Sequence, residues 1–468
     1  MAREITAEEK KIAADMLARA RAAMDKIRDY DQAQVDRLAR ALGWACGNER
    51  TFVRIAQMGV DESGVGDREG RAGKRLKILG VLRDALRQKS VGVIDVDEAK
   101  GITKIAKPAG VIASLIPMTN PELTPPVTAI YAIKCRDAVI FSPHPRSRRT
   151  TFEMTNVMRE TMRKLGAPED LFQCVEKPSI PLSAELMAAC DLTLATGGRP
   201  MVKAAYSSGK PAYGVGAGNS TMVIDETADI KDAARNSRIS KTSDFGSGCS
   251  ADGNLLIDAR TYDAMRDALI AEGGYLCNAD EKAQLEKAMW DSEGNRTIET
   301  VAIAPQKLAQ SAGFSIAADR KFIMVEQEEI GKRHRFSSEK LSVVMALFRY
   351  HGFDDALKKV AQIYEVGGKG HSCGIYSFDD DHIARLAAAA PVSRVMVRQP
   401  QSKANAGAFN NGMPMTSSLG CGVWGGNITN ENIALKHYMN VTWVSRPIPE
   451  DRPSDADLFG EFYNTETL

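Results

Sequence analysis

The sequence predicts an α/β fold with two domains, each built around a parallel β-sheet that is covered by helices. From residue 109 onward, short apolar segments alternate with helical stretches. The same alternation starts again near residue 254. Repeated β–α units of this kind are typical of a parallel sheet with helices on both faces. The length of 468 residues also allows two or three domains.

The first part of the chain is expected to be helical. Thr6 and Glu9 form a capping-box pattern at the start of a helix that runs to about residue 30. A second helical pattern covers roughly residues 32–57. Residues 91–108 then carry β-branched side chains at near-alternating spacing, which indicates extended structure.

The strands and helices of each series can be placed from the same patterns. In the first series, the predicted strands are 110–117, 137–143, 191–196 and 221–225, with helices at 124–134, 150–166 and 201–208. In the second series, the predicted strands are 254–258, 321–325, 341–348 and 394–399. The boundary between the two domains is expected near residues 226–240.

The composition excludes several classes of protein. Lys and Arg number 61 against 60 Asp and Glu, so a nucleic-acid or membrane-surface partner is not expected. The chain has no apolar run of about 18 residues, and no membrane span is therefore predicted. The N-terminus is charged and lacks the apolar centre of a signal peptide, which favours a cytoplasmic location.

The cysteines include one candidate nucleophile. The eight cysteines are scattered and form no C-x-x-C pair, which argues against a zinc site or a disulfide framework. Cys249 lies in a loop of small residues, SDFGSGCSADGN, which would let a substrate reach the sulfur. Backbone N–H groups of such a loop can face an oxyanion. A thiolate there could add to an aldehyde and form a hemithioacetal that loses a hydride. The alternative is a small side chain buried for packing.

Other candidate residues have an ordinary structural alternative. Asn120 could donate to an oxyanion or form the turn before Pro121. Cys421 lies between two glycines and competes with Cys249 for the nucleophile role. The segment ATGG at 195–198 joins a strand to a helix, where a cofactor phosphate can bind, but it lacks the G-x-G-x-x-G pattern and could be a tight turn. No histidine pair has metal-ligand spacing on a helix face, so no metal is predicted.

Several longer runs occur in one order along the chain. They are IPMTNP, IFSPHPRS, ATGGRPMVKAAYSSGKPAYGVGAGNS, the loop at Cys249, EKLS, GKGHS and LGCGVWGGNITNEN. Together they resemble the CoA-dependent, acylating branch of the aldehyde dehydrogenase superfamily, from about residue 30 to residue 445. Within that branch, the run SKTSDFGSGCSADGN is most similar to the acylating sulfoacetaldehyde dehydrogenases.

The resemblance implies roles for individual residues. Cys249 falls at the position of the family's nucleophile. Asn120 falls at the position of the side chain that donates to the oxyanion, together with the Cys249 backbone N–H. Cys421 belongs to a glycine-rich run that is structural in the family. Cofactor contacts are implied at the strand end Ser142, Pro143 and His144, at the turn Thr196, Gly197 and Gly198, and at Glu339. Relatives often carry Asn-Gly and bulkier side chains before the cysteine, where this chain has Gly-Ser-Gly.

The resemblance also implies an aldehyde dehydrogenase-like architecture with two Rossmann-like domains. A cofactor-binding domain is expected at 1–228, a catalytic domain with Cys249 at 229–432, and a C-terminal segment at 433–468. Residues 91–108 and the C-terminal segment are expected to form an oligomerisation arm, through which the chain makes a homodimer or homotetramer. The short, charged first helix favours the free cytoplasm over a bacterial microcompartment.

The implied reaction oxidises a short aldehyde to its acyl-CoA, with NADP or NAD as the cofactor and coenzyme A as the co-substrate. Arg146, Arg148 and Arg149 cluster after the strand that meets the adenosine. Guanidinium groups there could pair with a 2′-phosphate, which places NADP slightly ahead of NAD. A solvated, basic helix start is the alternative.

The aldehyde is expected to be anionic. Arg398 and Lys403 lie in or beside the loop 399–412, which closes the substrate tunnel in relatives. These cations could meet a sulfonate or a carboxylate, so sulfoacetaldehyde is the first expectation and succinate semialdehyde the second. Either side chain could equally be a surface charge, and acetaldehyde is a further alternative.

Two other functions stay open. A hydrolytic aldehyde dehydrogenase would release a free acid, which requires a general base to activate water. The stretch YGVGAGNS at 213–220 has no acidic residue where hydrolytic relatives supply that base, and Val215 or Gly214 occupies its place. The CoA thiol needs less help because it ionises within about two pH units of neutrality. An inactive oligomeric scaffold is the other alternative, and the joint presence of Cys249, Asn120 and Glu339 argues against it.

Overall fold

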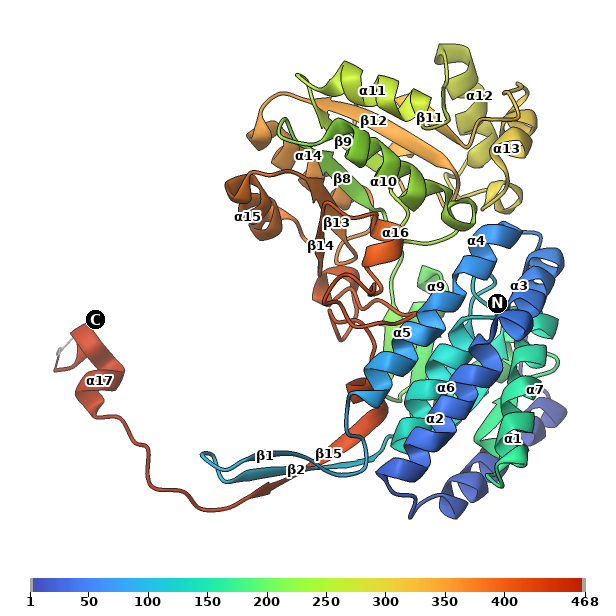
Figure 1. The fold of residues 1–468 in the computed structure, drawn as a ribbon, viewed down its shortest axis with the longest axis vertical. Coiled ribbons are helices and arrows are strands. Elements are labelled where there is room, and N and C mark those ends of the chain that lie inside the picture. Colours follow the sequence, from blue (N-terminus) through green and yellow to red (C-terminus); the bar gives the residue numbers. More distant parts are fainter. Residues whose placement is uncertain (1–2, 465–468) are drawn as a thin grey trace.

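The chain folds around two parallel β-sheets and one small antiparallel sheet (Figure 1). The computed structural model describes residues 3–464. The larger parallel sheet lies in the upper part of Figure 1, and the N-terminal helices cover the smaller sheet in the lower part. This arrangement confirms the predicted α/β class, with two parallel-sheet domains and a separate arm.

The smaller parallel sheet has the strand order β5-β4-β3-β6-β7. Its strands are β3 (Val111–Ile116), β4 (Ala138–Pro143), β5 (Phe172–Cys174), β6 (Leu192–Thr196) and β7 (Ala212–Val215). The helices of this domain are α1 (Ala7–Lys26), α2 (Gln32–Gly47), α3 (Glu49–Ser63), α4 (Arg68–Gly73), α5 (Arg75–Leu86), α6 (Thr124–Cys135), α7 (Arg148–Lys164), α8 (Ile180–Ala189) and α9 (Arg199–Tyr206). Every residue of β3 and β4 is buried, as expected at the centre of a sheet covered on both faces.

The N-terminal helices match the prediction at the start of α1 but not at the predicted helix 32–57. Thr6 and Glu9 form the predicted capping box at the start of α1. The single helix predicted over 32–57 is wrong, because α2 and α3 are separate. Between them, Asn48 has an extended backbone (φ −66°, ψ 147°), and its side chain accepts a hydrogen bond from the backbone N–H of Thr51. Asn48 therefore caps α3 and redirects the chain.

The larger parallel sheet has the strand order β10-β11-β12-β9-β8-β13-β14. Its strands are β8 (Thr221–Ile224), β9 (Asn254–Asp258), β10 (Gly274–Leu276), β11 (Phe322–Glu326), β12 (Val344–Tyr350), β13 (Cys373–Tyr376) and β14 (Val395–Val397). The helices are α10 (Ile230–Thr242), α11 (Tyr262–Ala271), α12 (Ala279–Met289), α13 (Pro305–Ala312), α14 (Phe353–Val366), α15 (Asp380–Ala389) and α16 (Gln401–Ala404).

The division between the sheets comes one strand earlier than the expected boundary at residue 228. The sequence series placed the strand at 221–225 in the first domain, but β8 pairs with β9 and β13 of the larger sheet. Hydrophobic patterning finds such a strand without showing which sheet it joins, because strand pairing is a long-range property. The sheets therefore divide between β7 and β8.

The C-terminal chain returns from the larger sheet to the smaller one. Met415, Ile433, Leu435 and Tyr438 are buried in the hydrophobic core of the smaller sheet. The segment between β14 and the arm therefore spans both domains, and part of it lines the cavity described below.

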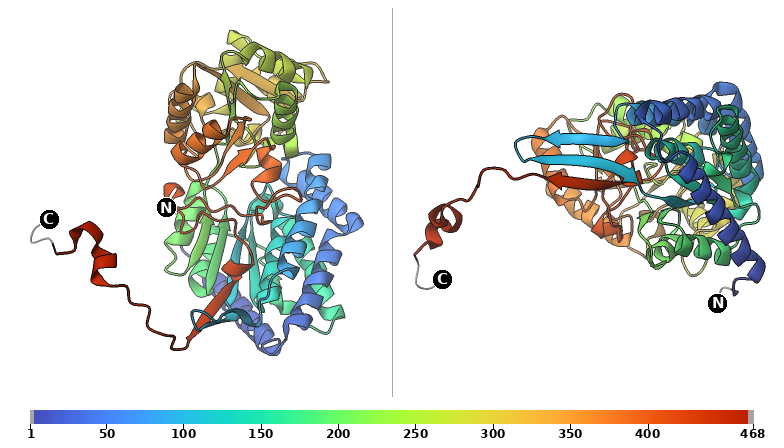
Figure 2. Two further views of the ribbon diagram at one scale, coloured as in Figure 1. Left: turned by 60° about the vertical axis from the view of Figure 1, so that its left-hand side comes forward. Right: turned by 90° about the horizontal axis from the view of Figure 1, so that it is seen from below.

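The two segments expected to form an arm lie side by side in one antiparallel sheet. Its strands are β1 (Gly92–Asp97), β2 (Ile102–Pro108) and β15 (Met439–Ser445), with β2 in the middle. The arm projects from the smaller domain and continues into a tail that carries α17 (Asp455–Phe459), as Figure 2 shows. Its part in oligomerisation stays a prediction.

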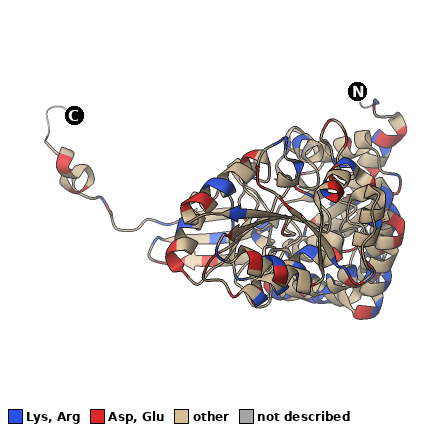
Figure 3. Ribbon diagram, turned by 90° about the horizontal axis from the view of Figure 1, so that it is seen from above, with Lys and Arg blue, Asp and Glu red and all other residues tan. Residues whose placement is uncertain are grey.

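Acidic and basic residues are interspersed over the body of the molecule in the view of Figure 3. Within residues 3–464, no helix has the length and apolar character needed to cross a membrane.

Candidate active site

The loop that carries Cys249 has an unusual backbone. It starts with a short 3₁₀ turn, Ser243–Gly246, in which Asp244 and Phe245 both have φ of 50°. Positive φ is uncommon for residues other than glycine, so surrounding contacts must hold this turn in place. Those contacts come mainly through the Asp244 side chain, which is 1% exposed.

Asp244 joins the cysteine loop to the first domain. Its carboxylate accepts hydrogen bonds from Arg71 Nε at 2.9 Å, Lys74 Nζ at 2.6 Å and Ser247 Oγ at 2.6 Å. Burial opposes ionisation of this carboxyl, but Lys74 and Arg71 outweigh it and hold the Asp244 pKa below its usual value. The ion pairs thus fix the Cys249 loop against α4 and α5.

The Cys249 thiol lies against a histidine that precedes β13 of the larger sheet. Cys249 Sγ is 3.0 Å from His371 Nε2, and the imidazole is fully buried. Burial, with a further contribution from Glu339, raises the pKa of the Cys249 thiol to about 12. Burial, and then Arg394, lowers the pKa of His371 to about 3. The resting pair is therefore a neutral thiol beside a neutral imidazole.

A hydrogen-bond network determines whether the imidazole nitrogen that faces the sulfur carries a proton. His371 Nδ1 is 2.8 Å from Ser372 Oγ, which also accepts from Asn405 Nδ2 at 3.0 Å. Ser372 Oγ lies 3.3 Å from Ser220 Oγ, which donates to the Cys249 carbonyl at 3.1 Å. The network is complete when His371 Nδ1–H donates to Ser372 and Ser372 donates to Ser220. Nε2 is then unprotonated and can take the proton of the thiol.

Asn120 is oriented by Lys74. The ammonium of Lys74 lies 2.6 Å from Asn120 Oδ1 and 3.1 Å from the Thr119 carbonyl. Because an ammonium can only donate, the atom that faces it must be the carbonyl oxygen of the amide. The amide N–H groups of Asn120 are therefore free of Lys74, and Asn120 lines the same cavity as Cys249.

This cavity has a volume of about 540 Å³ and lies between the two domains. Its lining includes four site residues that the sequence predicts: Asn120, Thr196, Cys249 and Lys403. It also includes His371, Lys74 and Lys77, which the sequence analysis did not select. For His371 a signal was present, since the run GKGHS belongs to the family resemblance. No local pattern distinguishes Lys74 or Lys77 from other helix lysines.

The residues predicted to hold the cofactor lie around the ends of parallel strands. Thr196 ends β6, and Gly197 and Gly198 lead into α9. Thr196 Oγ1 is 2.9 Å from Ser418 Oγ, and Thr196 also lines the cavity that contains Cys249. A strand that ends in two glycines before a helix N-terminus can accept the phosphates of a dinucleotide. The turn therefore fits NAD or NADP.

The other cofactor candidates lie outside this cavity. Ser142 and Pro143 end β4, where Ser142 Oγ lies 2.8 Å from Ser183 Oγ of α8, and His144 follows directly. Arg146 is exposed, and one of its N–H groups donates to the Ser63 carbonyl at 2.6 Å. These residues are not brought into contact with Cys249.

Glu339 lies close to the cysteine loop. Its Oε1 accepts a hydrogen bond from the backbone N–H of Gly218 at 3.0 Å. Gly218 packs so tightly on the loop that a Cβ there would lie 2.0 Å from the Cys249 carbonyl oxygen. Gly218 thus connects Glu339, a predicted cofactor residue, to the Cys249 loop.

Two further candidates from the sequence, Cys421 and Arg398, do not line this cavity. The Cys421 side chain is fully buried, 3.6 Å from the Leu419 carbonyl, and does not line it. Arg398 was expected beside the substrate. It has φ of 51° directly after β14, and its guanidinium lies over the Phe378 ring at 4.4 Å. Of the two predicted substrate cations, only Lys403 lines the cavity.

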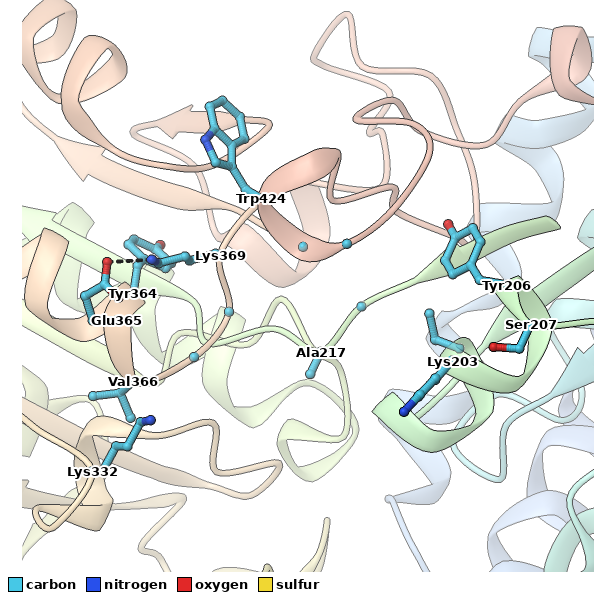
Figure 4. Close-up of a pocket in the computed structure, with 16 residues that line it drawn as sticks. Lys203, Tyr206, Ser207, Ala217, Lys332, Tyr364, Glu365, Val366, Lys369 and Trp424 are labelled. Atoms are coloured by element: carbon cyan, nitrogen blue, oxygen red, sulfur yellow. Dashed lines mark hydrogen bonds and ion pairs between the residues drawn. The ribbon is translucent and has the colours of Figure 1, made fainter. Parts of the chain in front are cut away.

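A second cavity, of about 620 Å³, lies beside α9 (Figure 4). Lys203, Lys332 and Lys369 line it, and Trp424 stands at its edge in Figure 4. Gly216 lines both cavities. None of the predicted cofactor residues lines this second cavity.

Comparison with known proteins identifies the family. The model of the aldehyde dehydrogenase family matches residues 2–283, which is more than half of the chain. The chain belongs to the aldehyde dehydrogenase family.

Relatives within the family share nearly the whole length of this aldehyde dehydrogenase. It is 43% identical to a sulfoacetaldehyde dehydrogenase from Acholeplasma sp., covering 95% of this chain and 93% of the relative. It is 38% identical to an acylating sulfoacetaldehyde dehydrogenase from Bilophila wadsworthia, covering 97% and 99%. An acetylating aldehyde dehydrogenase from Geobacillus thermoglucosidasius has a similar structure, with a TM-score of 0.92, 34% identity and coverage of 96% and 99%. The predicted resemblance to the acylating branch is confirmed.

Proposed function

We propose that this enzyme oxidises a short anionic aldehyde and transfers the acyl group from Cys249 to coenzyme A. One observation carries the proposal: the Cys249–His371 pair lies in a cavity whose lining includes no carboxylate. The pair supplies a nucleophile and a proton acceptor for thiol chemistry. A general base of the kind that hydrolytic relatives use to activate water is missing from the lining.

The first step is addition of the Cys249 sulfur to the aldehyde carbon. A neutral thiol is a weak nucleophile, so its proton must leave as the S–C bond forms. His371 Nε2, at 3.0 Å, accepts that proton. The aldehyde oxygen becomes an oxyanion, and the Asn120 amide and the Cys249 backbone N–H are the donors that would stabilise it.

The second step leaves a thioester on Cys249. A bound nicotinamide cofactor would supply the acceptor for the hydride that the hemithioacetal loses. Thr196, Gly197, Gly198 and Glu339 would hold this cofactor beside the cysteine loop. Collapse of the oxyanion restores the carbonyl, and the S–C bond to Cys249 is kept.

The third step returns the enzyme to its resting form. His371 first releases the proton that it took from Cys249, which is the one proton released overall. It then accepts the proton of the CoA thiol. The CoA sulfur adds to the thioester carbon, the Cys249 thiolate leaves, and His371 returns the proton to it. The overall reaction converts aldehyde, oxidised cofactor and CoA into acyl-CoA, reduced cofactor and one proton. Thiol exchange of this kind is nearly thermoneutral, so the reaction should also run in reverse.

Sulfoacetaldehyde is the proposed substrate. Two of the relatives that cover nearly the whole chain are named for that aldehyde, one of them as an acylating enzyme. The cavity supports an anionic substrate because Lys74, Lys77 and Lys403 line it without any acidic residue. Succinate semialdehyde is the second candidate, since a 33% identical relative from Clostridium kluyveri is a succinate-semialdehyde dehydrogenase (acetylating).

NADP is the proposed preferred cofactor. Arg146, Arg148 and Arg149 are all exposed at the start of α7, next to the strand end at Ser142. Their guanidinium groups can pair with a 2′-phosphate. An engineered glycolyl-CoA reductase, 25% identical with a TM-score of 0.82, has a structure with bound NADP+.

Product analysis tests the reaction and the cofactor together. Wild-type enzyme with sulfoacetaldehyde, NADP+ and CoA should form sulfoacetyl-CoA and NADPH in equal amounts. NAD+ should give a lower kcat/KM than NADP+. Chromatography of the products separates acyl-CoA from free acid. Rapid formation of sulfoacetate without CoA would contradict the acyl-transfer assignment and support a hydrolytic enzyme.

The oligomer, the domain limits and the cellular location remain proposals. The arm exposes Val93, Val96, Val441 and Trp443, which supports pairing with a second copy as a homodimer or homotetramer. Two functional units, a cofactor-binding one that ends between β7 and β8 and a catalytic one through about residue 432, are consistent with a cavity between the two sheets. We propose a cytoplasmic enzyme.

A further inference from the structure

Two of the three lysines that line the Cys249 cavity lack a carboxylate partner. Lys74 pairs with Asp244 at 2.6 Å, so its charge is balanced. Over the part of the chain that the structure describes, Lys77 and Lys403 make hydrogen bonds but no ion pair. The cavity around the nucleophile therefore carries two ammonium groups whose charge is not neutralised at contact distance.

Both ammonium groups are held in position by neutral oxygen atoms. Lys77 Nζ, from α5, donates to the carbonyls of Ala406 and Gly407 at 2.7 and 2.6 Å. Lys403 Nζ, from α16, donates to Ser243 Oγ at 2.8 Å. Ser243 begins the turn that leads to Cys249. These contacts fix the two cations relative to the nucleophile's loop without removing their charge.

Each of the two cations is influenced by the positive charge of another cavity lysine. Burial, followed by the charge of Lys403, lowers the pKa of Lys77 to about 8. Burial, followed by Lys74, also lowers the pKa of Lys403. Asp84 attracts Lys77, and Asp244 and Asp67 attract Lys403, but from beyond ion-pair distance. An anion placed between like charges in a partly dry cavity relieves their repulsion and binds more strongly than at an open surface.

We propose that Lys77 and Lys403 form the subsite for the anionic group of the substrate, a sulfonate or a carboxylate. They would hold this group while Cys249 adds to the aldehyde carbon at the other end of the molecule. This inference rests on the proposed function and adds the residues that select an anionic aldehyde over a neutral one. A phosphate of CoA offers the same chemistry and must be distinguished by experiment.

The test compares sulfoacetaldehyde with propionaldehyde, a neutral aldehyde of similar length. For Lys403→Met, the ratio of kcat/KM for sulfoacetaldehyde to that for propionaldehyde should fall about 10- to 100-fold, as expected for loss of one charged hydrogen bond. Lys403→Glu should lower the ratio further, because it places a like charge beside the anion. Lys77→Met should act in the same direction. Lys358→Met, which removes an exposed lysine of α14, is the matched control and should leave the ratio unchanged.

The outcomes separate the subsite from the reaction. Lys77 also supports the backbone at Ala406, so Lys77→Met can destabilise the fold, whereas the more exposed Lys403 provides an independent test. An equal loss for both aldehydes in the Lys403 variants, or no loss, would overturn the subsite. A higher KM for CoA with either aldehyde, at an unchanged ratio, would assign the lysines to a CoA phosphate and would also overturn it. Failure of the proposed function is a different result: wild-type enzyme would form no acyl-CoA from either aldehyde.

Discussion

Cys249→Ser should lose turnover by roughly 10⁴-fold or more, the scale seen when a nucleophile is removed. A serine hydroxyl is a much weaker nucleophile than a thiol, and it is also less acidic, so His371 accepts its proton less readily. The substitution removes no contact with the proposed cofactor residues. Binding of NADP+, measured by quenching of tryptophan fluorescence, should therefore be retained.

Cys421→Ser is the control for the Cys249 variant. Cys421 is fully buried in the glycine-rich segment and does not line the active-site cavity. A serine of nearly the same size should keep most of the activity, with some loss of thermal stability. An inactive Cys421 variant together with an active Cys249 variant would reverse the assignment of the nucleophile.

His371→Ala should lower kcat by about 10²- to 10⁴-fold, the usual contribution of a positioned proton acceptor. Without the imidazole, the thiol proton must go to solvent or hydroxide. Because the pKa of the Cys249 thiol is raised to about 12, the fraction ionised in the variant should rise about tenfold per pH unit between pH 7 and 9. The wild-type rate should depend less on pH, since His371 accepts the proton within the pair.

The pH profile separates a chemical role of His371 from a structural one. A variant that had only lost packing would show a lower rate with the same pH dependence as the wild type. His351→Ala, which changes an exposed histidine outside the cavity, should leave both rate and profile unchanged. Equal pH slopes for wild type and His371→Ala would contradict the role of the imidazole as proton acceptor.

The fold was predictable from sequence where its signals are local. Fully buried strands such as Val111–Ile116 and Ala138–Pro143 read as short apolar runs, and the capping box at Thr6 marks the first helix. The break at Asn48 and the sheet to which β8 belongs were not predictable in the same way. The first depends on the backbone of a single residue, and the second on pairing with strands far along the chain.

The candidate site was also predictable only where its signals are local in the sequence. Cys249 could be selected because its loop is rich in small residues. Thr196 ends a predicted strand, and Asn120 follows one. His371 is 122 residues away from Cys249 in sequence, and only the tertiary fold brings the two side chains together. Arg398 and Lys403 looked equivalent as nearby cations. The positive φ of Arg398 directs it away from the cavity, whereas Lys403 lies on a short helix that lines it.

Transfer of the acyl group from Cys249 to CoA is the central claim, and a stopped-flow measurement of NADPH formation tests it most directly. Enzyme mixed with sulfoacetaldehyde and NADP+ but no CoA should show a burst of about one NADPH per active site, followed by a slow phase, because the thioester accumulates when water is not activated. Adding CoA should restore continuous turnover and yield one acyl-CoA for each NADPH. Continuous turnover without CoA, with free acid as the product, would contradict the account.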